Sequence, residues 1–134
     1  MTASSLDRSL AGSVQSPAGL DLPPVAPLAL EVAGTAALPR LTVAGEVDCT
    51  SAPQVAAVLD ELVAAAPQEV LVDLTAVTFL DSAGLCTLAA GHRKALAGGG
   101  RLRVLAATRA VIRPLQITGL WDLLGGERVG GAAT

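Results

Sequence analysis

The stretch from Val70 to Gly84, which reads V-L-V-D-L-T-A-V-T-F-L-D-S-A-G, constrains the fold more than any other part of the chain. It begins as a nearly continuous aliphatic run, which is typical of a strand buried on both faces of a sheet. It ends on Asp81-Ser82-Ala83-Gly84, immediately before a helical pattern. We therefore expect a buried strand that passes directly into a helix, with Ser82 at the junction.

Ser82 is the candidate functional residue of this junction. A serine at the start of a helix is a natural N-cap, because its hydroxyl accepts a hydrogen bond from a free backbone N–H. The same position tolerates a phosphate, since the helix N-terminus carries partial positive charge. The residue chemistry alone leaves two interpretations open: Ser82 is only a capping residue, or it is a phosphoacceptor.

Two strands and a helix precede this stretch. Residues 28–33 and 37–47 have strand patterns separated by Gly34-Thr35, so we expect an antiparallel hairpin. Pro39 has no backbone donor, which should place its end of the second strand at the sheet edge. Ser51 to Gln54 has the S-x-x-Q form of a capping box, so a helix should begin there and stop at Pro67.

A helix, a strand and a second helix are expected after Gly84. The first helix carries an apolar stripe of Leu85, Leu88, Ala89, His92 and Leu96 and ends at three glycines. A strand over 101–105 follows, and then a helix over 108–117, kinked or cut short by Pro114, with Arg109 and Arg113 on a solvated face. Residues 120–124 should dock on the core through Trp121. This order predicts an α/β fold with a small mixed four- to five-stranded sheet flanked by helices.

The domain should occupy residues 28–124. Residues 1–27 are rich in Ser, Ala, Gly and Pro and show no sustained period, so we expect a disordered lead-in. Residues 125–134 are glycine-rich and should form a flexible tail. With 134 residues, the chain has room for one ordinary hydrophobic core.

Charge and composition favour a protein partner. The net charge of −3 disfavours counterion-driven nucleic-acid binding, and aromatic residues, at 1%, are too few to form stacking platforms for bases. We find no apolar run of the ~18 residues that a membrane span needs and no signal-peptide core. We therefore expect a cytoplasmic protein without membrane insertion. Cys49 and Cys86 lack the spacing of a zinc site, so we expect buried free thiols and neither metal nor cofactor.

An enzymatic role for Ser82 is disfavoured. Leu80 to Gly84 imitates part of the nucleophile elbow G-x-S-x-G, but the first glycine is missing. The single histidine, His92, is ten residues further on in the same helix, about 15 Å along its axis and out of reach as a base. We therefore expect the protein not to be an enzyme.

Five motifs together resemble the STAS domain, and more narrowly the anti-sigma factor antagonists. In order along the chain they are G-E-V-D at 45–48, L-V-D-L at 71–74, V-T-F-L-D-S-A-G-L at 77–85, G-G-R-L at 99–102 and I-T-G-L at 117–120. The match spans about residues 28–124. It implies the same mixed sheet flanked by helices.

The resemblance also implies a mechanism. In the antagonist branch, the serine after the aspartate of the D-S-x-G motif is phosphorylated by a partner anti-sigma factor that is itself a serine kinase, and a phosphatase reverses the modification. By position, this serine is Ser82, and Asp48, Asp81, Ser82, Ala83 and Gly84 are expected at the partner interface. Many antagonists have a second serine where this chain has Ala83, so here the choice between two adjacent serines does not arise.

Four further polar residues have structural interpretations beside functional ones. Asp48 is a turn residue before the first helix or part of the partner surface. Asp73 should be hydrogen-bonded inside the strand, and Thr75 could be a second phosphoacceptor, as in some relatives that build large stress-signalling assemblies. His92 should be a satisfied residue at the boundary of the core.

One alternative function keeps the fold. Small STAS proteins also serve as subunits of lipid-transport ABC systems, in which the same helix start docks on the ATPase without a phosphorylation cycle. The D-S-A-G turn at 81–84 is compatible with both functions.

Overall fold

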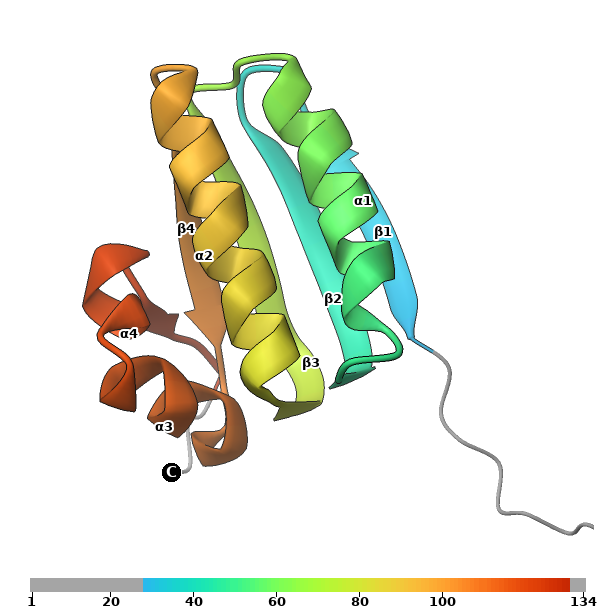
Figure 1. Ribbon diagram of the computed structural model, residues 1–134, viewed down its shortest axis with the longest axis vertical. Helices are drawn as coiled ribbons and strands as arrows, with labels where there is room; N and C mark the ends of the chain where they lie inside the picture. The colour runs from blue at the N-terminus through green and yellow to red at the C-terminus, as the bar shows by residue number, and fades with distance from the viewer. Residues whose placement is uncertain (1–27, 131–134) are drawn as a thin grey trace, which may run out of the picture.

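The computed structural model of the protein describes residues 28–130, which form a five-stranded sheet with helices (Figure 1). The elements in chain order are β1 (Ala29–Gly34), β2 (Pro39–Val47), α1 (Ala52–Ala64), β3 (Glu69–Leu80), α2 (Ser82–Ala97), β4 (Arg101–Ala106), α3 (Arg109–Ile117), α4 (Leu120–Leu123) and β5 (Glu127–Arg128). The expected lead-in, 1–27, and the last residues of the expected tail, 131–134, lie outside the described residues.

The sheet is mixed, as the sequence predicts. Its strand order is β1-β2-β3-β4-β5, in which β1 is antiparallel to β2 and the other neighbours are parallel. The carboxyl ends of β2, β3 and β4 therefore lie at one edge of the sheet, where the chain passes into α1, α2 and α3. Functional residues that follow different strands are brought together at this edge.

Much of the core lies between the sheet and the layer of α1 and α2, which run side by side across one face of it (Figure 1), and α3 adds buried residues such as Val111 and Leu115. The register places Leu41 beside Val72 and Val72 beside Val104, and all three side chains are fully buried. Burial of such a side chain contributes about 1.5–3 kcal/mol. Residues one position away in the strands alternate to the opposite face, which carries Arg40, Asp73 and Arg103.

The two covering helices pack closely because α2 has a glycine at their contact. A Cβ on Gly91 would lie 3.2 Å from Leu59 Cδ1 of α1. The buried face of α1 includes Val55 and Leu59. The apolar stripe predicted for α2 is only partly confirmed. It is expected to end at Leu96, but Leu96 is 54% exposed and Ala95 is buried in its place. A period of 3.6 allows either residue to face the core.

The expectation for Pro39 is corrected. The strand β2 lies inside the sheet, between β1 and β3, and is not an edge. Pro39 is its first residue, and the ladder with β3 begins one residue later, with Arg40 beside Leu71. Because Pro39 precedes this ladder, its missing N–H removes no pairing with β3.

The C-terminal part docks through Leu124, not through Trp121 alone. Leu124 is fully buried, and its carbonyl accepts a hydrogen bond from Val104 N at 3.1 Å, whereas Trp121 is only partly buried. A flexible tail is expected from Gly125, but Glu127–Arg128 form β5, which pairs with the end of β4. Among residues 28–130, no helix has both the length and the apolar composition needed to cross a bilayer.

Candidate functional site

The candidate site lies where β2 and β3 end. The backbone N–H of Asp81 donates to the carbonyl of Val47 at 3.1 Å, which ties the last residue of β2 to the junction between β3 and α2. The loop that begins at Asp48 and the first turn of α2 therefore share one edge of the sheet. The structure thus brings the two predicted parts of the partner surface together.

Asp81, and not Ser82, is the N-cap of α2. One carboxylate oxygen, Oδ1, accepts hydrogen bonds from Ala83 N at 2.9 Å and Gly84 N at 3.2 Å. The backbone of Asp81 is extended, as an N-cap requires, and Ser82 is the first residue of the helix. The sequence-based placement of the cap on Ser82 is therefore wrong by one residue, because an aspartate caps as well as a serine and precedes it here. The Ser82 side chain is exposed and takes no part in the cap.

Gly84 sets the position of this helix start. A Cβ at Gly84 would lie 2.4 Å from Leu80 Cδ1 and 3.0 Å from Val47 Cγ1, so any larger residue would force these side chains or the helix start to shift. Gly84 is buried, while Ala83 is half-buried and Ser82 is exposed. The first turn of α2 is thus packed against the sheet through Gly84, and the Ser82 side chain is exposed to solvent.

Asp48 organises the loop between β2 and α1. Its Oδ1 accepts hydrogen bonds from Thr50 N at 2.9 Å, Thr50 Oγ1 at 2.7 Å and Ser51 N at 3.1 Å. These bonds, those from Thr50 above all, hold the pKa of the Asp48 carboxyl below its usual value. The structural interpretation as a turn residue is correct, and a contact of Asp48 with a partner stays a prediction.

The predicted capping box is not formed. Ser51 is the N-cap residue of α1, but its side chain makes no cap hydrogen bond. Its Oγ donates to the carbonyl of Glu46 at 2.8 Å and accepts from Asp48 N at 3.0 Å. The Ser51 hydroxyl thus closes the loop back onto the end of β2 and is unavailable to the helix.

Asp73 has the structural role that the sequence suggests. It is 5% exposed, accepts hydrogen bonds from Thr75 N at 2.9 Å and Thr75 Oγ1 at 2.6 Å, and forms an ion pair with Arg40. Burial raises the pKa of Asp73, but the bonds from Thr75 and the charge of Arg40 outweigh it, so the net pKa lies below the usual value. The hydroxyl of Thr75 is thus engaged, whereas the Ser82 side chain takes no part in the cap of α2.

His92 has a structural role, as expected, but it is buried and does not lie at the boundary of the core. It is 5% exposed, and its Nδ1 accepts a hydrogen bond from Leu102 N at 3.2 Å. Burial lowers the pKa of His92, and the charge of Arg101 lowers it further. The imidazole is therefore neutral at pH 7 and joins α2 to β4.

Cys49 and Cys86 are exposed free thiols, which corrects the expectation that they are buried. Cys49 lies in the loop after Asp48, and Cys86 lies one helical turn beyond Ser82, on a face of α2 that the sheet does not cover. Among the described residues, no group of three or more His, Cys, Asp or Glu side chains is arranged to hold a metal ion.

Sequence reasoning missed Phe79 as part of this edge. Phe79 is 47% exposed, although it lies in a largely apolar strand, and it pairs with Glu46 of β2. Register shifts between β2 and β3 break the simple alternation before this point. An exposed aromatic side chain three residues before Ser82 is a candidate anchor for a partner.

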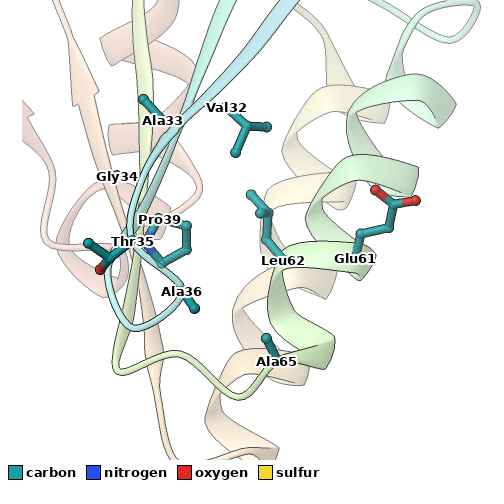
Figure 2. Close-up of a pocket in the computed structure, with 9 residues that line it drawn as sticks. All are labelled: Val32, Ala33, Gly34, Thr35, Ala36, Pro39, Glu61, Leu62 and Ala65. Carbon is teal, nitrogen blue, oxygen red and sulfur yellow. The ribbon is translucent and has the colours of Figure 1, made fainter.

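A hollow lies at the opposite end of the sheet from the candidate site and is not part of that site. It has a volume of about 350 Å³ and lies between the turn after β1 and the end of α1, with Val32 and Leu62 facing one another across it (Figure 2). It is lined mainly by apolar side chains and is remote from the helix start at Ser82.

Comparison with known proteins identifies the family. The family model described as "Mlab, STAS domain" matches residues 30–125. The chain belongs to the STAS domain family. The sequence-based resemblance to this family, and the mixed α/β fold that it implied, are both confirmed.

Relatives of this STAS domain include the anti-sigma-F factor antagonist RsfB of Mycobacterium tuberculosis, which is 35% identical over 80 residues. That alignment covers 60% of this chain and 65% of the relative, so the chain spans just under two thirds of the curated relatives it matches.

Solved structures are similar as well. An anti-sigma factor antagonist from Mycobacterium paratuberculosis is 33% identical with a TM-score of 0.69, covering 76% of this chain and 88% of that one. The antagonist SpoIIAA in its unphosphorylated form is 21% identical with a TM-score of 0.66, covering 78% and 92%. The phosphorylated form of Bacillus SpoIIAA is 20% identical with a TM-score of 0.61, covering 78% and 96%. The two SpoIIAA structures support the fold alone.

Proposed function

We propose that this STAS domain is an anti-sigma factor antagonist. In its unphosphorylated form it binds an anti-sigma factor that is also a serine kinase, and it thereby releases a sigma factor. Phosphorylation of Ser82 by that kinase ends the binding, and a phosphatase restores it. The observation that carries this proposal is the exposed Ser82 hydroxyl at the start of α2, directly after the capping Asp81, in a chain whose relatives are named as antagonists.

The partner surface that we propose comprises Asp48, Asp81, Ser82, Ala83 and Gly84, together with Phe79. These residues lie on the two loops and strand ends at the carboxyl edge of β2 and β3. Phe79 supplies exposed apolar area of the kind that anchors interfaces. Ser82 contributes an exposed neutral hydroxyl that a partner can bury at small cost.

Phosphorylation at Ser82 should leave the domain folded. A phosphoserine adds a charge of about −1.5 to −2. The macrodipole of α2 stabilises that charge by about 0.3–1 kcal/mol, while repulsion from Asp81 at an exposed site opposes it by a similar amount. The N–H groups of Ala83 and Gly84 are already bound to Asp81, so the phosphate gains no cap of its own there. The two electrostatic effects nearly cancel in the free domain.

The effect of phosphorylation should therefore fall on the interface. A partner that buries the Ser82 hydroxyl would have to desolvate a dianion beside the Asp81 carboxylate. An uncompensated buried charge costs several kcal/mol, which corresponds to about 100-fold or more in affinity. This difference is large enough to switch association off.

The phosphorylation site can be tested directly. The protein is incubated with a candidate anti-sigma kinase and ATP, and the added phosphate is located by mass spectrometry. We expect a single phosphate at Ser82 that is absent in Ser82→Ala and retained in Thr75→Ala, the control for the other suggested acceptor. Stable co-purification with a transporter ATPase and no phosphate would instead favour the lipid-transport alternative.

The interface can be tested without the kinase reaction. Ser82→Asp introduces a charge, and Ser82→Asn introduces a neutral side chain of nearly the same size. We expect Ser82→Asp to weaken binding to the anti-sigma factor by about 100-fold and Ser82→Asn by much less, as measured by calorimetry. Equal weakening by the two variants would mean that size, and not charge, controls the contact, and the proposed switch would be wrong.

A further inference from the structure

A second cluster of charged side chains lies on α3, away from Ser82. Arg109, Arg113 and Gln116 recur at spacings of four and three residues, so they share one face of this helix. All three are exposed. The expectation that Arg109 and Arg113 are solvated is therefore correct, but the face that they form is not an ordinary helix surface.

The strand β5 brings a third arginine to this face. Arg128 pairs with Ala106, the last residue of β4, and Val129 N donates to the Ala106 carbonyl at 2.8 Å. Since Arg109 follows Ala106 by three residues, this pairing places Arg128 next to the start of α3. The three arginines, Gln116 and Ile112 line a hollow with a volume of about 290 Å³.

The positive charge of the hollow is not neutralised within the described part of the chain. Arg109, Arg113 and Arg128 form no ion pair among residues 28–130, and neither does Arg93 of α2, whereas Arg40, Lys94, Arg101 and Arg103 each pair with a carboxylate. Arg109 is the first residue of α3, where a positive charge opposes the helix macrodipole, and the first turn contains no acidic residue. Arg109 and Arg113 also repel each other across one helical turn. The protein has a net charge of −3, so this local excess of positive charge runs against its overall balance.

We propose that this arginine hollow, formed by Arg109, Arg113 and Arg128, binds an oxyanion of the phosphate class. Guanidinium groups bind phosphate through paired N–H donors. The charge of three guanidinium groups is balanced better by a phosphate dianion than by a single carboxylate. Gln116 offers a further amide, and the nearly buried Ile112 gives the hollow an apolar wall.

The volume admits more than the bare anion. A phosphate group occupies only part of a hollow of about 290 Å³, and the remainder can hold the organic part of a small phosphate ester. Inorganic phosphate and such an ester present the same group to the arginines. The residues involved do not include Ser82, so this proposal is independent of the proposed function.

The test is a titration of the full chain with inorganic phosphate at constant ionic strength, followed by NMR of the backbone amides and arginine side chains. We expect saturable shifts confined to residues 109–116 and 128. Arg128→Gln should weaken binding by about tenfold, because it removes one of three charged partners. Arg93→Gln, which removes an exposed arginine of α2 outside the hollow, should change affinity by less than about twofold.

Further titrations distinguish the sources of the anion. Tighter binding of glycerol phosphate than of inorganic phosphate would support an ester as the ligand, and equal binding would support the inorganic anion. Absence of saturation, or equal weakening by Arg128→Gln and Arg93→Gln, would overturn the proposal. It would also fail if a glutamate-rich peptide bound the hollow and phosphate did not. Far-UV circular dichroism of each variant checks that the fold is retained.

Discussion

Replacement of Asp81 tests the assignment of the helix cap on which the presentation of Ser82 depends. Asp81→Ala removes the oxygen that accepts hydrogen bonds from Ala83 N and Gly84 N. Loss of an N-cap costs about 0.5–2 kcal/mol, and we expect about 1 kcal/mol here. Ser82→Ala should change the free energy of unfolding by less than about 0.5 kcal/mol, because an exposed side chain outside the cap is lost.

A double variant sharpens the test. When Asp81 is replaced, the helix can begin one residue later, and Ser82 then becomes the only residue able to cap it. We therefore expect the double variant Asp81→Ala/Ser82→Ala to lose more stability than the sum of the single losses. Asp81→Asn is the matched control, since asparagine caps about as well as aspartate and only the charge is removed.

The assay is urea unfolding of each variant, followed by far-UV circular dichroism and by the fluorescence of Trp121, the single tryptophan. A loss of 1 kcal/mol also lowers the melting temperature of a domain of this size by about 4–8 °C. If Ser82→Ala destabilised the domain as much as Asp81→Ala, Ser82 would be part of the cap. The free hydroxyl on which the proposed switch rests would then not exist.

Two further predictions concern packing and pH. In urea unfolding, Gly84→Ala should be less stable than Gly91→Ala by about 1–3 kcal/mol. The new methyl carbon would lie 2.4 Å from Leu80 Cδ1 in the first variant and 3.2 Å from Leu59 Cδ1 in the second. Equal stability of the two variants would contradict the tight packing of the helix start. Burial, with the charge of Arg101, lowers the pKa of His92 in the folded state, so the unfolded chain takes up this proton at higher pH. The free energy of unfolding should therefore be insensitive to His92 above its ordinary pKa of about 6.5 and should fall as the pH drops below it. His92→Gln should lose this part of the pH dependence between about pH 7.5 and about pH 5.5, and an unchanged slope would show that His92 is not its source.

Much of the fold can be predicted from the sequence because the local patterns agree with the final packing. The aliphatic run at 70–74 and the alternation at 101–105 become the buried strands β3 and β4. Pro67 and the glycines from Gly98 follow the ends of α1 and α2 as expected, whereas Pro114 lies inside α3 and does not end it. The edge that carries Ser82 also follows from the sequence, since it lies where a parallel strand ends and a helix begins.

The errors arise where two residues compete for one role. Asp81 and Ser82 can both cap α2, and the backbone geometry decides in favour of the aspartate. Ser51 and Gln54 have the spacing of a capping box, but the Ser51 hydroxyl donates its hydrogen bond to the carbonyl of Glu46 instead. Likewise, the exposure of Phe79 depends on register shifts between β2 and β3 that the sequence does not signal. Such outcomes depend on tertiary contacts, and local propensity cannot rank them.

The extended backbone at Asp81 has a consequence for the chemistry of modification. Because the Asp81 carboxylate caps the start of α2, the Ser82 side chain takes no part in the cap, and no cap hydrogen bond has to break before a kinase can reach its oxygen. Phosphoryl transfer to this oxygen would then proceed on the native domain, without a local opening step. The rate of phosphorylation at Ser82 should stay constant when mild denaturant or a distant core substitution makes local unfolding of the domain more frequent. Phosphorylation of Thr75, whose hydroxyl is hydrogen-bonded, should become faster under the same conditions.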